Sequence, residues 1–293
     1  MRIELKDVSY AYGPKRKKRK PEGPRILDRI GLVIEPGETV ALAGRSGSGK
    51  STLLQLIKGF LEPAEGALLL DGIAPYAAKQ PELFDRIGYI FQYPEHQLFA
   101  RTVREDIAFG LRSRKLSEEE TDIKVREAMQ AVGLDYEVYA ERSPFELSGG
   151  EKRRAAIAGV IVLEPEVLIL DEPTAGLDLP SRQGLFRLLE RLNRSGTTIL
   201  WVSHQLEEIL AHAPRLLVLS GNRLLADGRP AELLSDPRVL EPLGWVEPEA
   251  LAVSRLLASL GLIPEGTLLS AQEAAAVAAG YWRRNRKASG QPG

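Results

Sequence analysis

The chain has 293 residues, of which 44% are hydrophobic and 27% are charged, and its formal net charge is −1. Such a chain can bury a core larger than one ordinary domain of about 100–200 residues requires. The near-zero net charge gives no global electrostatic reason to bind nucleic acid. The absence of cysteine excludes disulfides, thiolate metal sites and cysteine nucleophiles, and it fits a reducing cytosol.

The first residues alternate between polar and apolar side chains, and Ile3 to Tyr10 is predicted to be a strand. This beginning has no apolar core of the kind found in signal peptides. The longest apolar stretch, residues 155–163, is much shorter than the ~20 residues that a membrane helix needs. We therefore expect any work at a membrane to be done through partner proteins.

A basic run at residues 15–20 stands between Pro14 and Pro21. Because like charges repel one another and stay hydrated, the run is predicted to be a solvated loop. Contact with anionic lipid is the main alternative, and a nuclear import signal is disfavoured.

Short apolar runs at residues 39–43, 167–170 and 198–202 are predicted to be strands, and residues 50–59 after the first run to be a helix. Such runs between helical segments are typical of a parallel sheet covered on both faces. Residues 92–165 are predicted to be an inserted helical subdomain. Within it, Ser117 and Glu120 form a capping box ahead of an apolar stripe, which consists of Val125, Ala128, Met129 and Val132.

The region after residue 230 contains no catalytic motif and is predicted to be a small helical extension, for packing or for dimerisation. Its first helix carries an apolar stripe that stops at Gly261 and consists of Val253, Leu256, Leu257 and Leu260. Ser270 and Glu273 are predicted to cap a last helix. Residues 285–293 are predicted to be disordered.

A phosphate-binding loop is the first motif that carries chemistry. It fits G-x-x-x-x-G-K-S/T and runs through Gly44, Arg45, Ser46, Gly47, Ser48, Gly49, Lys50 and Ser51, with Thr52 following. Its glycines let backbone N–H groups curl around phosphate oxygens, and the following helix directs its positive end at the same charge. Lys50 is predicted to bind the β- and γ-phosphates of ATP, and Ser51 to bind Mg²⁺.

Two carboxylates follow the apolar strand at residues 167–170. Downstream of a phosphate loop, Asp171 is the expected Mg²⁺-positioning carboxylate. Glu172 stands where it could polarise the attacking water as a general base.

The segment Leu147-Ser148-Gly149-Gly150-Glu151 combines a capping box with two bare glycine N–H groups, which makes an anion site at a helix N-terminus. Together with the two motifs above, residues 1–230 resemble the ABC ATPase family, whose signature is LSGGQ. The resemblance implies a P-loop NTPase fold: a RecA-like mixed sheet core, the inserted helical subdomain and an antiparallel β subdomain. Glu151 replaces the usual glutamine, and we expect function to survive this change because both side chains can close the capping box.

The resemblance implies roles for further residues. Gln92 matches the glutamine that contacts Mg²⁺ and the transmembrane partner, and His204 matches the switch histidine near the γ-phosphate. Asp178 matches the D-loop, which acts in trans with Ser148, Gly149 and Gly150. Tyr12 matches the aromatic residue that stacks on adenine, with Tyr10 left open as a competitor.

Residues 91–99, 142–147 and 156–160 resemble the energy-coupling factor transporters, which import vitamins and transition-metal ions, and specifically the second of their two ATPase subunits. This implies an ATPase at the cytoplasmic face of a bacterial membrane, a homologous or identical ATPase partner, a transmembrane coupling subunit and a substrate-binding membrane subunit. The docking wall would lie within residues 93–101 and use Tyr93, Glu95, Gln97, Leu98 and Phe99.

Other functions remain open at this point. They are the ATPase of another ABC importer, a nickel or cobalt uptake system, and more distantly a non-transport ABC protein. The single cassette, the lack of a long heptad run and the absence of cysteine disfavour the last. A small-molecule kinase would share the phosphate loop but would leave residues 147–151 unexplained.

Overall fold

The computed structural model describes residues 1–13, 23–267 and 271–288, and for residues 271–272 and 283–288 it describes the backbone alone. The basic run at residues 15–20 and the predicted cap Ser270 lie outside the described residues. The strands are β1 (Ile3–Tyr10), β2 (Leu27–Ile34), β3 (Thr39–Gly44), β4 (Glu65–Leu70), β5 (Ile87–Ile90), β6 (Val167–Leu170), β7 (Thr198–Val202), β8 (Arg215–Ser220) and β9 (Arg223–Gly228).

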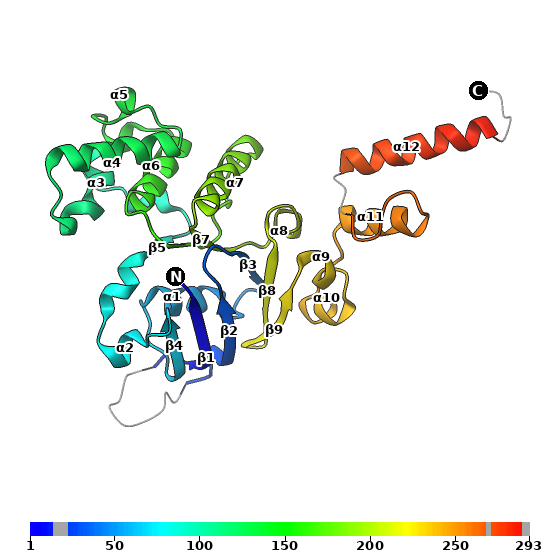
Figure 1. The fold of residues 1–293 in the computed structure, drawn as a ribbon, viewed down its shortest axis with the longest axis horizontal. Coiled ribbons are helices and arrows are strands. Elements are labelled where there is room, and N and C mark those ends of the chain that lie inside the picture. The colour runs from blue at the N-terminus through cyan, green and yellow to red at the C-terminus, as the bar shows by residue number, and fades with distance from the viewer. Residues whose placement is uncertain (14–22, 268–270, 289–293) are drawn as a thin grey trace.

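Helices connect and cover these strands (Figure 1). They are α1 (Lys50–Lys58), α2 (Pro75–Ala78), α3 (Val103–Ala108), α4 (Glu118–Ala131), α5 (Tyr136–Tyr139), α6 (Gly149–Ile161), α7 (Leu179–Arg194), α8 (Leu206–His212), α9 (Pro230–Leu233), α10 (Pro237–Leu243), α11 (Glu249–Ser259) and α12 (Ala271–Ala288). Short 3₁₀ helices are η1 (Pro81–Arg86), η2 (Pro94–Gln97), η3 (Phe109–Arg114) and η4 (Pro144–Glu146).

A six-stranded mixed sheet forms the centre, in the order β5-β6-β7-β3-β8-β9. Its neighbouring strands are parallel, except that β9 runs antiparallel to β8. The parallel sheet predicted from the short apolar runs is therefore confirmed. Because parallel strands all end at the same edge, the segments that follow β5, β6, β7 and β3 are brought together there.

Both faces of this sheet are buried, and alternate residues of β3 enter different parts of the core. Val40 and Leu42 pack with α1 and with the three-stranded sheet, whereas Ala41 and Ala43 pack with helices that include α6 and α7. Burial on both faces explains why the strand sequences are almost continuously apolar.

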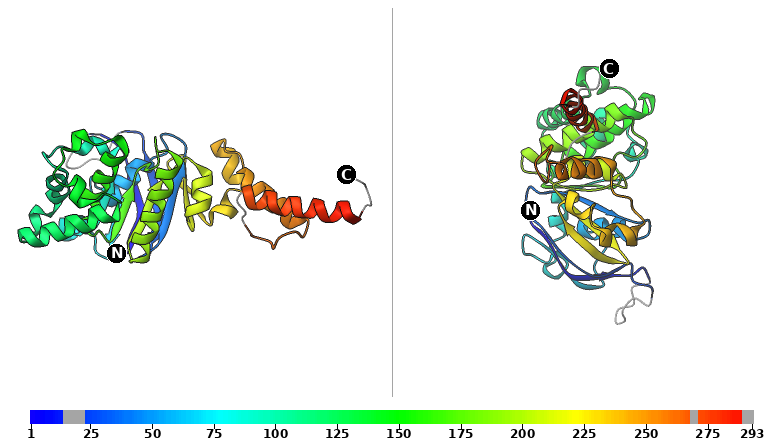
Figure 2. Two further views of the ribbon diagram at one scale, coloured as in Figure 1. Left: turned by 90° about the horizontal axis from the view of Figure 1, so that it is seen from above. Right: turned by 90° about the vertical axis from the view of Figure 1, so that its right-hand side faces the viewer.

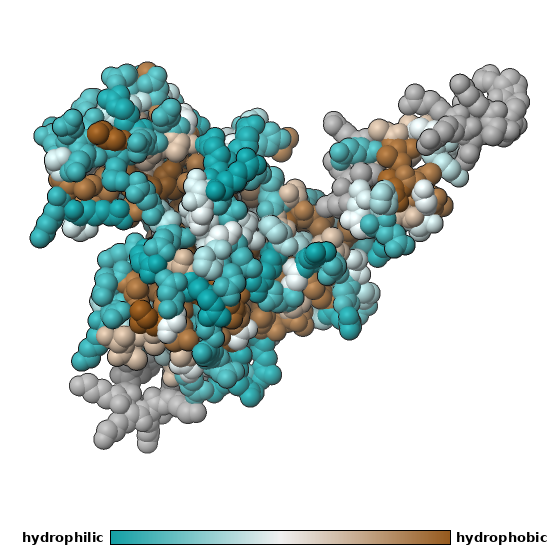
Figure 3. Space-filling view, viewed as in Figure 1, coloured by the Kyte–Doolittle hydropathy of each residue, from teal (hydrophilic) through white to brown (hydrophobic). Residues whose placement is uncertain are grey.

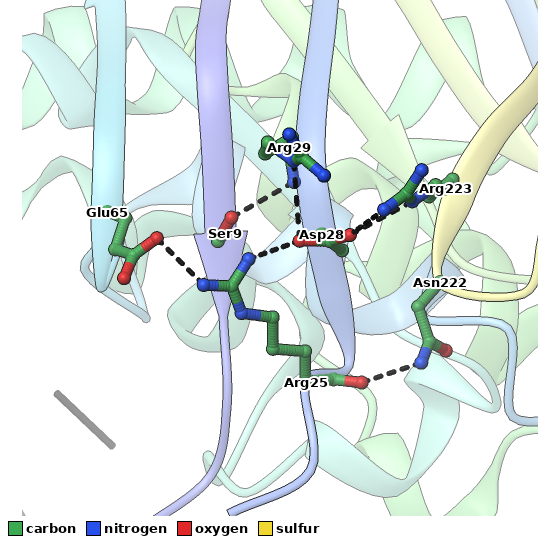
Figure 4. A network of polar contacts seen from close by, with 7 residues as sticks. All are labelled: Ser9, Arg25, Asp28, Arg29, Glu65, Asn222 and Arg223. Carbon is green, nitrogen blue, oxygen red and sulfur yellow. Dashed lines mark hydrogen bonds and ion pairs between the residues drawn. The ribbon is translucent and has the colours of Figure 1, made fainter. Parts of the chain in front are cut away.

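The three-stranded antiparallel sheet, in the order β2-β1-β4, lies beside the central sheet. Polar contacts join the two sheets through Asp28 (Figure 4). The Asp28 carboxylate accepts from Arg25 and from Nε of Arg223 on β9, the latter at 2.9 Å. Asn222 Nδ2 donates to the Arg25 carbonyl at 2.6 Å, and Arg25 Nη2 donates to Glu65 at the start of β4 at 3.0 Å.

Helices α3 to α6 form a separate layer, at the upper left of Figure 1. The predicted capping box of Ser117 and Glu120 is present at the start of α4. The apolar stripe of α4, from Val125 to Val132, is buried as predicted. Among the described residues, no helix is both long enough and apolar enough to cross a membrane.

The C-terminal helices differ from prediction in one respect. Residues 285–288, predicted to be disordered, continue α12 as helix. The stripe of α11 was predicted to serve packing or dimerisation; Val253, Leu256 and Leu260 are exposed and Leu257 is buried. The periodicity located an apolar face correctly, but this part of the fold leaves most of that face uncovered (Figure 3). Both helices extend away from the sheets (Figure 2).

Helix α7 provides a test of where the core lies, because the same residue type occurs at a buried and an exposed position. Leu189→Ala should lower the free energy of unfolding by about 2–5 kcal/mol, since Leu189 is 5% exposed and its loss leaves a cavity. Leu179→Ala should change it by less than about 0.5 kcal/mol, because Leu179 is 67% exposed. Chemical denaturation measures both, and equal losses would contradict this packing of α7.

Candidate functional site

The predicted phosphate loop connects β3 to α1 at the carboxyl edge of the central sheet. Gly44 has φ of +151°, and a Cβ there would lie 2.3 Å from the Leu219 carbonyl oxygen. Gly49, the N-cap of α1, has φ of +99°, and a Cβ there would lie 2.7 Å from a Leu27 methyl carbon. Both positions therefore need glycine for steric reasons. Arg45, Ser46 and Gly47 are the exposed tip of the loop.

Lys50 lies within this loop rather than pointing away from it. Its Nζ donates to the carbonyl oxygens of Gly44 and Arg45 at 2.9 and 3.0 Å. Burial lowers the pKa of the Lys50 ammonium, while Glu172 and Asp171 oppose that shift. The buried hydroxyl of Ser48 has no hydrogen-bond partner among the described residues. A buried ammonium and an unused hydroxyl in a loop of backbone N–H groups fit a polyphosphate.

Asp171 follows β6 and lies against the phosphate loop. Its side chain is hydrogen-bonded by Ser51, and its Oδ2 accepts from the Tyr89 hydroxyl at 3.2 Å. Burial raises the pKa of Asp171, although the Ser51 and Tyr89 hydrogen bonds and the Lys50 charge oppose the rise. The hydroxyl of Ser51 and the carboxylate of Asp171 are oxygen donors of the type that Mg²⁺ prefers, so the predicted pair fits this ion.

Glu172 joins three of the predicted residues in one cluster. Its Oε2 accepts from Gln92 Nε2 at 3.0 Å, and its Oε1 lies 2.7 Å from His204 Nε2. Gln92 follows β5, Glu172 follows β6 and His204 comes shortly after β7, so the three belong to adjacent strands. Glu172 also has a left-handed φ of +50°, which is uncommon for a residue other than glycine.

The two tyrosines proposed for adenine differ in their surroundings. Tyr12 is 53% exposed, and its hydroxyl lies 3.2 Å from Oγ1 of Thr52 in the first turn of α1. Tyr10 is half-buried in β1, and its ring contacts Tyr12 edge to face. The exposed ring beside the phosphate loop favours Tyr12 over Tyr10 for stacking.

The segment at residues 147–151 begins α6. Ser148 is its N-cap, and the capping box with Glu151 is present as predicted. Glu151 Oε2 accepts from the Ser148 hydroxyl at 2.7 Å, and Oε1 accepts from the Tyr139 hydroxyl at 2.7 Å. These bonds lower the pKa of Glu151 to about 2, so the carboxylate is ionised at neutral pH. Gly149 and Gly150 are exposed in the first turn of the helix.

Asp178 is the N-cap of α7, where its Oδ1 accepts from the Ser181 N–H at 3.0 Å. Arg153 on α6 connects this helix to the segment between Glu172 and Asp178. Arg153 Nη1 donates to the Ala175 carbonyl and Arg153 Nη2 donates to the Pro173 carbonyl, both at 2.8 Å. The start of α6 is thus attached to the segment that directly follows Glu172.

The predicted docking wall is only partly on the surface. Tyr93 and Phe99 are 42% and 59% exposed, and Gln97 is exposed as well. Leu98 is 8% exposed and packs in the core with α3 and α6, so its expected role as a surface anchor is wrong. The alternative, packing inside the subunit, holds for Leu98. One carboxylate oxygen of Glu95 is buried without a hydrogen-bond partner among the described residues.

Three residues that support this site were not identified from the sequence: Tyr89, Tyr139 and Arg153. Tyr89 places a hydroxyl group in the otherwise apolar strand β5, which ends shortly before Gln92. A polar group at such a position could have indicated a residue that supports the site. Arg153 is a charged residue on the buried side of α6. Tyr139 gave no signal, because its partner Glu151 is reached only through the tertiary structure.

Comparison with known proteins agrees with this geometry. Residues 27–175 match the family model described as ABC transporter. The chain is 42% identical over 264 residues to the energy-coupling factor transporter ATP-binding protein EcfA2 of Clostridium perfringens, across 89% of this chain and 91% of that protein. The chain belongs to the ABC transporter ATPase family.

Solved structures agree as well. One is cbiO1 of Clostridium perfringens, described as part of the ABC transporter complex cbiONQ. Its TM-score is 0.72 at 32% identity, over 88% of this chain and 98% of that one. Another is an ATP-binding cassette in a dimeric post-hydrolysis state bound to ADP and Pi, with a TM-score of 0.67 at 29% identity, over 78% and 98%. The P-loop NTPase fold and the ATP-hydrolysing activity expected from the sequence are confirmed.

Lys50→Ala tests the phosphate site. A hydrogen bond to a charged group contributes about 1.5–3 kcal/mol, so ATP affinity should fall about 10- to 100-fold. Turnover should fall roughly 10²- to 10³-fold, as when one donor to a developing anion is lost. Nucleotide titration and phosphate release measure the two effects. Lys124→Ala, which removes a surface ion pair with Glu164, is the charge-matched control. Near-normal hydrolysis by a folded Lys50→Ala chain would refute the assignment.

Proposed function

We propose that this ATPase energises an energy-coupling factor importer for vitamins or transition-metal ions, as a peripheral subunit at the cytoplasmic face of a bacterial cell membrane. The observation that carries the proposal is the Glu172 carboxylate, bonded to both Gln92 and His204. Gln92 directly precedes the exposed Tyr93, so the residues around the reacting phosphate are continuous with a surface that a partner can reach.

In this proposal the nucleotide is held by the phosphate loop. Lys50 leaves the carbonyl oxygens of Gly44 and Arg45 to bind the β- and γ-phosphates, and Tyr12 stacks on the adenine. Ser51, Asp171 and Gln92 would hold Mg²⁺, which supplies charge neutralisation on the phosphates when it is bound. Tyr89 holds the Asp171 carboxylate in position from β5.

Glu172 would act as the general base that orients and deprotonates the attacking water. A base of this kind must be held within hydrogen-bond reach of the water, and Gln92 and His204 restrict the carboxylate from both sides. His204 would also contact the γ-phosphate as the switch residue. Loss of either neighbour would leave the base present but less well oriented.

The site is proposed to be completed by a second ATPase, a homologue or an identical copy. Among the described residues, no hydrogen bond or ion pair joins the segment Ser148–Glu151 to the phosphate loop of the same chain. Ser148, Gly149 and Gly150 would therefore face the γ-phosphate held by the partner, with Asp178 at the same interface. The dimeric cassette bound to ADP and Pi supports this arrangement.

Glu172→Gln tests the base. The change preserves the shape of the side chain but removes its charge and basicity, so ATP should still bind while hydrolysis falls about 10²- to 10⁴-fold. With the correct partner ATPase, the closed dimer should accumulate, as measured by gel filtration with ATP and Mg²⁺. Glu207→Gln, the same change on nearby exposed α8, should leave turnover unchanged. Fast turnover in Glu172→Gln would show that another residue activates the water.

Force is proposed to pass to the transmembrane coupling subunit through the surface that consists of Tyr93, Glu95, Gln97 and Phe99. Tyr93 and Phe99 offer exposed aromatic area. Glu95 is half-buried between them, and its carboxylate would suit an arginine from the coupling subunit. A further membrane subunit would bind the substrate, and no nucleic acid is involved.

The chain is proposed to divide into an ATPase domain, residues 1–230, with a helical subdomain at about residues 92–165, and an extension at residues 231–293 that contributes to dimerisation. The exposed apolar residues of α11, Val253, Leu256 and Leu260, support the last point because they lack a covering element within the described chain.

Glu95→Lys tests the docking surface. Like charge against the expected arginine should reduce complex assembly and uptake, while basal ATP hydrolysis persists. Thermal unfolding must be measured in parallel, because Arg153 of the same chain also lies near Glu95. Glu95→Gln should have a weaker effect. Glu127→Lys, an equal charge reversal on exposed α4, should assemble normally. Normal assembly and transport by Glu95→Lys would exclude Glu95 as the docking contact.

A further inference from the structure

A cavity of about 500 Å³ lies beside the first turn of α6. It is open to solvent on one side, and its walls come from α6, from α7 with the segment just before it, and from the residues that end α4. Its volume falls within the range of about 300–1,000 Å³ that is typical of small-molecule sites. Of the residues proposed to contact nucleotide, the phosphate loop and Ser148 do not line it, whereas Gly150 does.

Four arginines line this cavity: Arg153 and Arg154 on α6, and Arg187 and Arg191 on α7. No aspartate or glutamate is among its lining residues. Four like charges around one small cavity repel one another, and an anion among them would reduce this repulsion. The cavity therefore has the composition of a site for an anion.

The inner arginines keep hydrogen-bond donors unused. Arg153 is 5% exposed; its two terminal nitrogens are held by the Ala175 and Pro173 carbonyls, but its Nε is buried without a partner among the described residues. Nε of Arg154 is likewise buried and unpartnered there. A buried N–H donor without an acceptor costs free energy.

The outer arginines are on the solvent side. Arg187 and Arg191 are both exposed, and Arg191 is oriented by donating to the Ala131 carbonyl at the end of α4, at 2.7 Å. Two carboxylates act electrostatically on the inner arginines. Glu95 interacts electrostatically with Arg153, and Glu151 interacts with Arg154. Neither carboxylate lines the cavity. Glu151 also accepts hydrogen bonds from Ser148 and Tyr139.

We propose that this cavity is a binding site for a small phosphate-type oxyanion, either free inorganic phosphate or the phosphoryl group of a small metabolite, held by Arg153, Arg154, Arg187 and Arg191. Guanidinium groups suit this ligand because they bind phosphate oxygens in pairs. The ligand would connect α6 to α7. Since Ser148 begins α6, an anion here would also stabilise the orientation of the signature segment. The proposal does not depend on the transported substrate.

The test measures equilibrium binding of inorganic phosphate by calorimetry, at fixed ionic strength and without Mg²⁺. The full chain carries Lys50→Ala throughout, which weakens phosphate binding at the nucleotide loop. Adding Arg187→Gln and Arg191→Gln should weaken the remaining binding at least tenfold. It should also abolish the rise in unfolding temperature that phosphate produces by binding the folded state.

The matched control adds Arg194→Gln and Arg229→Gln instead, which removes the same net charge from side chains that are 79% and 82% exposed and do not line the cavity. Binding to this control should be unchanged. Equal binding by both charge-reduced chains, or equal loss in both, would overturn the proposal. Absence of phosphate binding to the Lys50→Ala chain would overturn it as well, unless glycerol 3-phosphate binds there and is lost with the two cavity arginines.

Glycerol 3-phosphate distinguishes the two sources of the ligand. If it binds at least tenfold more tightly than inorganic phosphate, and this binding is lost with Arg187→Gln and Arg191→Gln, the site takes an organic phosphate. If the two bind equally and both are lost with the two arginines, the site takes free phosphate. Either result supports the cavity as an oxyanion site, whereas binding insensitive to both arginines contradicts it.

Discussion

Four adjacent parallel strands, β5, β6, β7 and β3, end at one edge of the central sheet, and this shared edge is the constraint on which the site depends. Gln92, Glu172, His204 and the phosphate loop each come shortly after a different one of these strands. Because the strands are neighbours, a single carboxylate, that of Glu172, can bond to the residues on either side. Separations of 80 and 32 residues along the chain are thereby reduced to hydrogen-bond distances.

Backbone conformation at this edge is as demanding as the side chains. Glu172 and Tyr93 both adopt left-handed φ angles, of +50° and +56°. Non-glycine residues pay of order 1 kcal/mol for such angles, and they keep them where surrounding contacts leave no alternative. Glu172 is contacted by Gln92 and His204. The segment after it is held by Arg153, which donates to the carbonyls of Pro173 and Ala175. The segment that carries the proposed base is therefore coupled mechanically to α6.

Through these contacts the helical layer is connected to the edge of the sheet that carries the site. Arg153 attaches the start of α6 to the segment after Glu172, and Arg191 attaches the end of α4 to α7. The same arginines line the cavity between these elements. Any ligand or partner that changes the spacing of α6 and α7 acts on residues that are only one contact away from the nucleotide edge.

Local patterns in the sequence were sufficient to identify the phosphate loop, the strand that delivers Asp171 and Glu172, the capping boxes at Ser117 and Ser148, and the stripe of α4. Each depends on residues close together in the chain, where steric demands on glycine, helix capping and side-chain periodicity act directly. Local patterns did not show whether an apolar residue is buried, because burial depends on which distant segments pack over it. Leu98 is buried, whereas Val253, Leu256 and Leu260 are exposed, although all belong to apolar patterns. The bonds of Tyr89 to Asp171, Tyr139 to Glu151 and Arg153 to Pro173 were likewise set by tertiary structure alone, because their partners are adjacent only after distant segments have packed.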